Sequence, residues 1–321
     1  MSRHLAPVPP AVPVGQVLPE LAAYSRPRLR DDVPVLWREA TSIQLGEDVI
    51  LDRVSRGQVA WLTSLDGLRS SAQVEVELPL PVDDARRLLR GARAAAALED
   101  AARIPDALRW AQAQDRDAAA QRFGAVLRTY RDLDTAFDAM AARQRSTIAI
   151  LGSGALADDL AGACRDTGLT VVDDRHATVT ILADGLHPDV PAHFDHHAQD
   201  RPHLAVAVLA DRALVGPLVI PGRTGCLRCA HLHHRDADPA WPLLAVQWSQ
   251  ALSGMPCRPI DPVLVRLAAL QSVLLVRAWL DRPDQPDQWS GFAVEVRLPD
   301  GLAARVARPA HPLCGCRWPA A

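Results

Sequence analysis

Residues 146–174, STIAILGSGALADDLAGACRDTGLTVVDD, decide the fold of the C-terminal half of this chain. An apolar strand is followed by a glycine turn, a helical stretch and a second apolar strand, which is the order of a βαβ unit. Two β-rich runs come next, ATVTILADG at residues 177–185 and HLAVAVLADRALVGPLVIPG at residues 203–222. This alternation predicts an α/β fold with a Rossmann-type sheet.

The glycine turn of this unit contains Gly152 and Gly154, and Ala157 stands where such turns often carry a third glycine. A turn that follows a strand and opens a helix is in the right place to bind a nucleotide phosphate. Gly152, Gly154 and Asp173 after the second strand are therefore the candidate cofactor-binding residues. The chain leaves little sequence after Asp174 to enclose an adenosine, which favours the alternative that the turn serves packing alone.

Two cysteine couples, Cys226-Leu-Arg-Cys229 and Cys314-Gly-Cys316, predict a metal site. Each couple sits on a short turn with a small residue, so that two sulfurs can point at one ion. Four thiolates close a tetrahedral zinc site with no open position, which makes the predicted zinc structural.

Two alternatives to this ligand set stay open in the sequence. The cysteines could be unligated thiols, or His231 or His311 could replace one of them. Two further cysteines fit neither couple: Cys164 is expected in the core of a helix, and Cys257 in a loop after a proline.

Before residue 146 the sequence predicts a smaller α+β unit. Residues 34–54 contain short alternating stretches typical of antiparallel strands. Ser55 is a candidate N-cap for a helix that ends at Gly67, and a second helix is expected to start near Val82 and to run to residue 100. Strands followed by short helices are compatible with a winged helix. The predicted division of the chain is residues 1–25 as a flexible tail, 26–105 as the winged-helix-like unit, 106–145 as linking helices and 146–321 as the α/β domain.

Composition and charge exclude several classes of function. The 35 basic and 38 acidic residues give a formal charge of −3, so nucleic acid is not an expected partner. The sequence contains no lysine, which excludes Schiff-base chemistry and a P-loop lysine. No stretch resembles a signal peptide, and the long apolar segment at residues 263–280 contains Arg266 and Arg277, so it is expected to be a buried helix and not a membrane span. These features predict a cytoplasmic protein.

A histidine-rich stretch raises the question of a second metal site. Its spacing is irregular and interrupted by prolines, which is more typical of a solvated loop than of a metal centre. The histidines are His187, His193, His196, His197 and His203.

Three segments resemble one known family: residues 215–229 (VGPLVIPGRTGCLRC), residues 236–242 (DADPAWP) and residues 311–316 (HPLCGC). Together they resemble ThiF-type (E1-like) proteins of actinobacteria that act as leader-peptide-binding or cyclodehydratase partners in thiazole/oxazole-modified peptide pathways, a branch of RiPP biosynthesis. The resemblance covers about residues 146–321. Residues 26–67 are similar to the PqqD-like peptide-recognition element, a small winged helix that pairs a leader peptide with its edge strand.

This resemblance implies a function and also shows where the chain departs from the family. Members that adenylate a carboxylate carry a fuller glycine loop, an Asn-Leu-x-Arg-Gln stretch and a nearby lysine, all of which are missing here. The resemblance therefore implies a non-catalytic zinc protein with no catalytic residue, which holds a peptide for a separate enzyme such as a YcaO-type cyclodehydratase and forms a homodimer.

Two rival functions remain at this point. The first is an active adenylating enzyme that binds ATP at residues 152–157 and Mg²⁺ through Asp173 or Asp174. The second is a structural or regulatory dimer.

Overall fold

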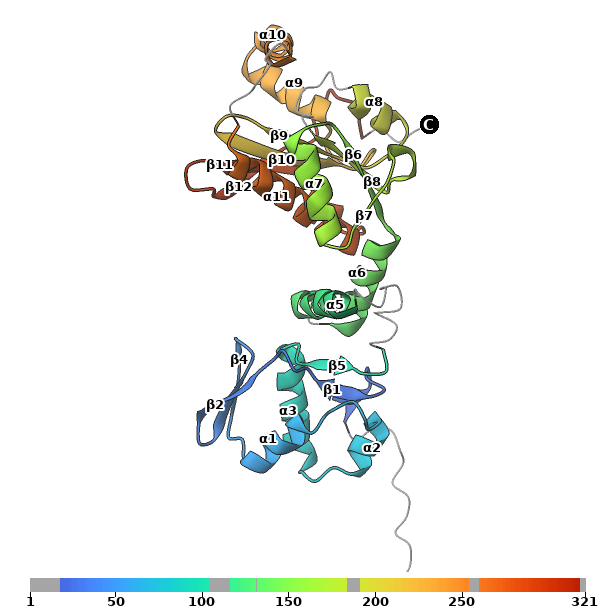
Figure 1. Ribbon diagram of the computed structural model, residues 1–321, viewed down its shortest axis with the longest axis vertical. Helices are drawn as coiled ribbons and strands as arrows, with labels where there is room; N and C mark the ends of the chain where they lie inside the picture. The colour runs from blue at the N-terminus through green and yellow to red at the C-terminus, as the bar shows by residue number, and fades with distance from the viewer. Residues whose placement is uncertain (1–17, 104–115, 131, 184–190, 254–259, 318–321) are drawn as a thin grey trace, which may run out of the picture. The chain divides into compact units, whose positions relative to one another are not determined.

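The computed structural model describes residues 18–103, 116–130, 132–183, 191–253 and 260–317. The chain divides into two compact units, Met1–Asp138 and Ala139–Ala321. Figure 1 labels the helices and strands of the two units. The predicted boundaries at residues 26, 106 and 146 remain predictions.

The first unit is built from two small antiparallel sheets and short helices. One sheet has the strand order β2-β3-β4, and the other pairs β1 with β5. The elements are η1 (Pro19–Leu21), β1 (Pro27–Leu29), β2 (Val35–Glu39), β3 (Ser42–Leu45), β4 (Val49–Asp52), α1 (Arg56–Thr63), α2 (Ser71–Val76), α3 (Val82–Ala94), β5 (Leu98–Asp100) and α5 (Arg116–Tyr130).

The three strands expected within residues 34–54 are confirmed, and so is the helix start at Ser55. The Ser55 hydroxyl accepts a hydrogen bond from the Gln58 N–H, and the Gln58 side chain accepts one from the Ser55 N–H. This capping box satisfies two backbone donors at the start of α1. The helix ends at Thr63, a few residues before the predicted end at Gly67.

The second helix was expected to run to residue 100, but residues 98–100 form a strand. Helix α3 ends at Ala94, and Ala96 has a φ of 49°, a left-handed conformation that breaks the helix. The next residues pair antiparallel with β1. The Asp100 carboxylate accepts hydrogen bonds from the backbone N–H groups of Ser25 and Arg26, each at 2.9 Å. Tertiary pairing thus overrides the helical propensity of the alanine-rich run.

The second unit contains a seven-stranded sheet in the order β12-β11-β10-β9-β8-β6-β7. Strands β7, β6, β8 and β9 are parallel, and β10, β11 and β12 are antiparallel additions. The elements are α6 (Leu133–Arg145, which begins in the first unit), β6 (Thr147–Leu151), α7 (Ala155–Asp166), β7 (Thr170–Val171), η3 (Asp174–His176), β8 (Val179–Ala183), α8 (Pro191–Ala198), β9 (His203–Val208), β10 (Arg212–Val219), α9 (Leu227–Ala237), α10 (Trp241–Ser253), α11 (Pro262–Asp281), α12 (Pro286–Trp289), β11 (Phe292–Arg297) and β12 (Ala303–Ala307).

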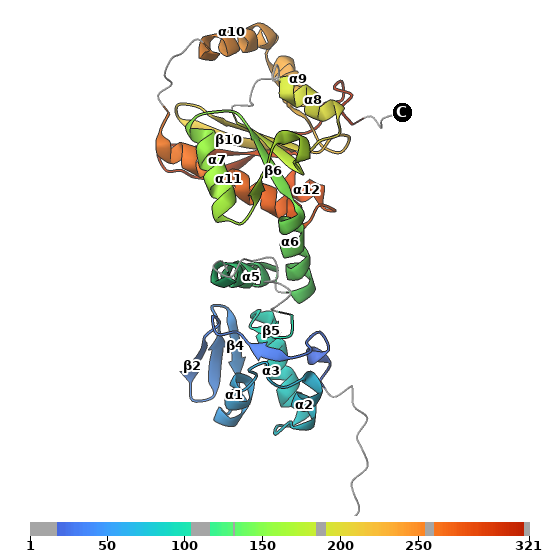
Figure 2. The ribbon, with the colours of Figure 1, turned by 45° about the vertical axis from the view of Figure 1, so that its right-hand side comes forward.

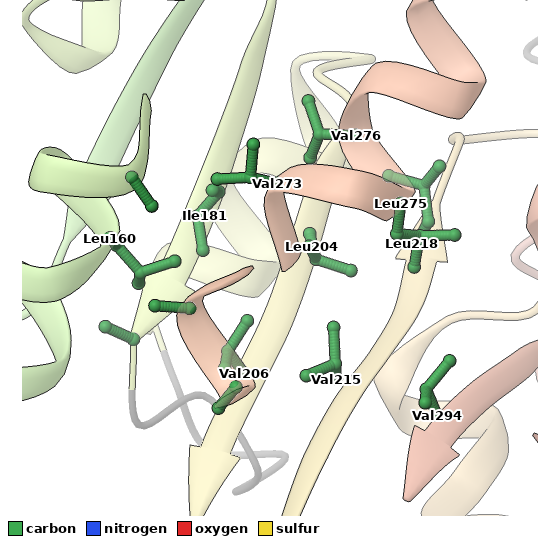
Figure 3. Packing of buried hydrophobic residues seen from close by; sticks show 14 of the residues in the cluster. Leu160, Ile181, Leu204, Val206, Val215, Leu218, Val273, Leu275, Val276 and Val294 are labelled. Carbon is green, nitrogen blue, oxygen red and sulfur yellow. The ribbon is translucent and has the colours of Figure 1, made fainter. Parts of the chain in front are cut away.

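Helices cover both faces of this sheet. Helices α7 and α11 lie on one face, and α8 and α9 lie on the other (Figures 1 and 2). The core under α7 and α11 takes alternate residues of the central strands, as the two-residue period of a strand requires. Figure 3 shows these side chains meeting those of Leu160, Val273 and Val276. The opposite residues of the same strands face α8 and α9.

The long apolar helix α11 is a core helix of this unit, as expected. Its length and mean hydropathy of 1.7 would allow a membrane span, but 56% of the span is buried inside the fold. Its C-terminal Asp281 forms an ion pair with Arg143 of α6, with an N–O distance of 2.5 Å. Cys164 of α7 is fully buried in the same core, also as expected, and burial raises the pKa of its thiol to about 11. Cys257 lies outside the described residues.

Candidate functional site

The two cysteine couples converge on one point in the second unit. The Sγ atoms of Cys226 and Cys229 are 3.8 Å apart, those of Cys226 and Cys314 are 3.5 Å apart, and those of Cys229 and Cys316 are 3.3 Å apart. All four sulfurs lie within 4.8 Å of one another. A tetrahedral zinc ion with Zn–S bonds of about 2.3 Å would place its sulfurs about 3.8 Å apart. The four side chains therefore fit a closed zinc site.

Two glycines bring the couples together. A Cβ on Gly225 would lie 2.8 Å from the Arg308 carbonyl oxygen and 2.9 Å from the Ala310 nitrogen. Only glycine allows the backbone that leads to the second couple to approach the first so closely. Gly315, between Cys314 and Cys316, has a φ of 75°, which turns both sulfurs to the same side.

The local electrostatics favour thiolates that are held by a cation. Cys226 is the N-cap of α9, and Cys229 lies in the first turn, where the helix dipole favours negative charge. The hydrogen bond from the Cys226 thiol lowers the pKa of Cys229 to about 4 and raises that of Cys226. Burial raises the pKa of Cys316 to about 12. Four clustered sulfurs, three of them on buried residues, cannot all ionise without a divalent ion between them, and zinc would supply that charge.

Both histidines that were alternative ligands are engaged elsewhere. His311 Nε2 lies 2.8 Å from an oxygen of Asp236, and its Nδ1 accepts a hydrogen bond from the Leu313 N–H. His231 Nδ1 accepts a hydrogen bond from the Trp241 indole at 3.0 Å. Among the described residues, the four cysteines form the one group of three or more potential ligands that is compact enough for a metal ion.

The glycine turn lies between β6 and α7, as expected, and its two glycines serve different purposes. Gly152 has a φ of 144°, and a Cβ there would lie 2.6 Å from the Ala183 Cβ, so packing alone requires glycine. Gly154, with a φ of 79°, faces open space at the start of α7. Asp173 is exposed in the segment after β7. Nucleotide binding by these three residues stays a prediction.

Asp174, the other acidic residue considered for Mg²⁺, is held by protein groups. Its carboxylate accepts hydrogen bonds from the Thr180 hydroxyl at 2.7 Å and from Arg201 at 2.8 Å, and lies 2.9 Å from His196 Nε2. Burial opposes ionisation, but these hydrogen bonds outweigh it and lower the pKa of Asp174 to about 2. The carboxylate thus has a structural role between η3, β8 and α8.

The expectation of a solvated histidine loop was wrong for three of the five residues. His193 and His196 lie on α8 and His203 begins β9, and their exposed fractions are 1%, 2% and 0%. His203 donates from Nδ1 to the Arg201 carbonyl, so its Nε2 accepts from His193 Nδ1 at 2.7 Å. Burial lowers the pKa of His193 to about 3 and that of His203 to about 4. His197 is half-buried on α8, and His187 lies outside the described residues.

A cavity of about 720 Å³, which was not predicted from the sequence, lies between the β10–β11 face and helices α9 and α10. Its residues come from strands and helices that are far apart in the chain. Two sequence signals were available: the two tryptophans at positions 241 and 248, seven residues apart, and the polar residues that alternate along β11.

Comparison with known proteins finds solved structures of similar fold. The sequence matches no protein-family model and no curated protein. The heterocyclase TruD matches with a TM-score of 0.61 and 18% identity over 91% of this chain, which spans 42% of the TruD chain. E. coli MccB, in a structure with AMPCPP and MccA, matches with a TM-score of 0.61 and 10% identity over 90% of this chain and 99% of its own. The microcin C7 biosynthetic enzyme MccB in complex with N-formylated MccA matches with a TM-score of 0.60 and 12% identity over 91% of this chain and 99% of its own. The chain therefore has the fold of these proteins.

Proposed function

We propose that this protein is a zinc-stabilised adaptor without catalytic activity in the modification of a peptide. It binds a leader peptide through its first unit and presents it to a partner enzyme such as a YcaO-type cyclodehydratase. The neighbours in fold are a heterocyclase and an enzyme whose structures contain a peptide, which supports a role in peptide modification. The observation that carries the proposal is an open strand edge in the first unit.

The open edge belongs to β4, the last strand of the sheet β2-β3-β4. Within the described residues, β4 has a partner strand on one side only. An extended peptide can add a strand at such an edge, where backbone hydrogen bonds give affinity and side-chain pockets give specificity. Ile50 of β4 is 48% exposed, which offers an apolar contact to such a strand.

Helix α3 makes the β4 edge a better site than the opposite edge at β2. Leu51 of β4 packs against Gly91, where an added Cβ would lie 2.7 Å from a Leu51 methyl group. Arg87 of α3 donates hydrogen bonds to the carbonyls of Asp52 and Arg53, which ties the helix to the end of the strand. In Figures 1 and 2, β2 lies farther from α3 than β4 does. A peptide beside β4 would thus meet a helix wall as well as a strand.

Titration of the full chain with a precursor peptide encoded beside its gene tests this proposal. We expect binding in fluorescence anisotropy, and about tenfold weaker binding by Ile50→Asp, because a buried apolar contact is replaced by a charge. Trp37→Asp on β2 is the control for the other edge, and Leu68→Asp, at a 74% exposed position, is the control for added surface charge. Binding by Ile50→Asp equal to wild type, or no binding by any such peptide, would contradict the proposal.

The partner enzyme gives a second measurement. If the protein presents the peptide, the cyclodehydratase should process the full precursor faster when the adaptor is present, and a leaderless peptide should show no such gain. A homodimer, expected from the resemblance, is measured by light scattering. A dimer that binds no peptide would favour the structural or regulatory alternative.

The adenylating alternative makes the opposite prediction for ATP. We expect that ATP with Mg²⁺ leaves the unfolding midpoint unchanged, because the chain has no lysine and Asp174 is held by Thr180 and Arg201. A ligand at about 100 times its Kd would stabilise the fold by about 2.7 kcal/mol. A clear rise in midpoint that Asp173→Asn abolishes, together with pyrophosphate exchange, would favour the enzyme.

A further inference from the structure

The cavity under α9 and α10 lies on the sheet face opposite to the α11 core. Val215 and Val294 point into that core, whereas Leu214 of β10 and Ala293 and Glu295 of β11 line the cavity. Its volume of about 720 Å³ lies in the range of small-molecule sites, which are mostly apolar with a few polar groups.

The walls of the cavity are apolar and aromatic. Trp241 and Trp248 come from α10, and His231 and His234 come from α9. The Trp241 ring lies 4.5 Å from the His234 ring, with 33° between their planes, and its indole N–H is bound to His231. Hydrogen bonding and ring stacking thus fix Trp241 at the cavity wall, while Trp248 remains 57% exposed. Such rings favour an apolar, planar group between them.

One positively charged side chain in this cavity forms no ion pair with any residue that the structure describes. Five charged residues line it, and four of them pair with each other: Arg297 with Glu295, and both Arg297 and Arg212 with Asp211, with N–O distances of 3.8 and 3.9 Å. The fifth, Arg308, makes no ion pair within the part of the chain that the structure describes. Its side chain is half-buried and donates one hydrogen bond, to the Ala307 carbonyl at 3.2 Å. Burial lowers the pKa of its guanidinium, and the charge of Glu295 opposes this shift. An unpaired, partly desolvated cation attracts an anion.

We propose that this cavity binds an apolar, preferably aromatic, group that carries a carboxylate. The ring lies against Trp241 and Trp248, and the carboxylate pairs with the Arg308 guanidinium, whose planar fork matches a carboxylate. The ligand is a free carboxylic acid or an aromatic residue beside an acidic side chain in a peptide. The site lies wholly in the second unit, so it does not depend on the leader-peptide proposal.

Calorimetry with simple probes tests the chemistry of the ligand. We expect the full, zinc-loaded chain to bind 3-phenylpropionate at least about tenfold more tightly than 3-phenylpropanamide, which has the same ring without the charge. The pair acetyl-Phe-Asp-amide and acetyl-Phe-Asn-amide tests the peptide source. If only 3-phenylpropionate binds more tightly than its amide, the natural ligand is a small carboxylic acid. If the Asp peptide also binds more tightly than the Asn peptide, the natural ligand is a peptide.

Three variants connect the binding to the cavity. Arg308→Gln should remove the preference for the acid over the amide, and Trp248→Ala, at an exposed position, should weaken both ligands without disturbing the core. Arg266→Gln on α11, whose side chain is 77% exposed, is the control and should bind as wild type. Zinc content and unfolding midpoint establish that each variant is folded.

The proposal is overturned if neither acid binds better than its amide, or if Arg308→Gln keeps the preference. Dimerisation that is lost in Trp248→Ala, with no binding of either acid, would instead assign the aromatic wall to contact with a second copy of the chain.

Discussion

Replacing Cys229 by serine is expected to remove bound zinc and to lower the unfolding midpoint of the second unit sharply. The sulfur of Cys229 lies 3.8 Å from that of Cys226 and 3.3 Å from that of Cys316, so its loss opens the tetrahedron. Zinc at about 1,000 times its Kd stabilises the native state by about 4.1 kcal/mol. For a unit of this size, the loss of that free energy lowers the unfolding midpoint by about 8–16 °C. Elemental analysis and calorimetric unfolding measure the two effects.

Cys164→Ala is the matched control for this experiment. Cys164 is buried, as Cys229 is, but lies in the α7 core, so the variant should keep one zinc ion per chain and lose only packing energy. Chelation of the wild-type protein should reproduce the Cys229→Ser midpoint. Native protein that contains no metal, or full zinc content in Cys229→Ser, would refute the site.

Acidification is expected to destabilise the second unit through its buried histidines. The folded-state pKa values of His193 and His203, about 3 and about 4, lie below the unfolded value of about 6.5. The unfolded chain therefore binds more protons, and stability falls as the pH drops from about 6.5 towards these folded values. At about pH 5, each imidazole ring that stays neutral in the folded state lowers the free energy of unfolding by about 2 kcal/mol. Urea unfolding at several pH values measures this slope.

The double variant His193→Gln and His203→Gln should flatten that slope, because its side chains do not titrate. The other titratable or charged groups near the pair are His196, His197, Arg201, Asp174 and His231. His176→Gln, at an exposed position on η3, is the control and should keep the wild-type slope. An unchanged slope in the double variant would show that other groups cause the acid sensitivity. Asp174, with a folded pKa of about 2, adds to the loss only below about pH 4.

Each cysteine couple could be recognised as a candidate metal-binding pair because its signal is chemical and short-ranged. Each cysteine couple is complete within four residues or fewer, and thiolates at such spacing have few other uses inside a reducing cell. The approach of the two couples could not be derived from spacing, since it depends on contact between Gly225 and the backbone of residues 308–310. The pair His193 and His203 could not be predicted from the sequence, because the two rings meet only when α8 packs over β9.

Secondary structure was predictable where a periodic pattern coincided with local capping. The strands at residues 34–54 and the Ser55 N-cap are examples. The prediction was wrong at residues 98–100, where pairing with β1 decides the conformation of an alanine-rich run. The cavity had only weak local signals, the tryptophan pair of α10 and the alternating polar residues of β11, because its lining also comes from β10, α9 and the segment after β12.

The sequence by itself determined the α/β class and the two cysteine couples, whose spacing suits a metal ion. These follow from apolar periodicity and from donor chemistry, which are local properties of a chain. Only the tertiary structure decided that three of the histidines are buried, that Asp174 is held by a helix and a neighbouring strand, and that Arg308 lines an aromatic cavity without an ion-pair partner among the described residues. Burial and pairing are set by which distant segments share a sheet face, and no single segment carries that information.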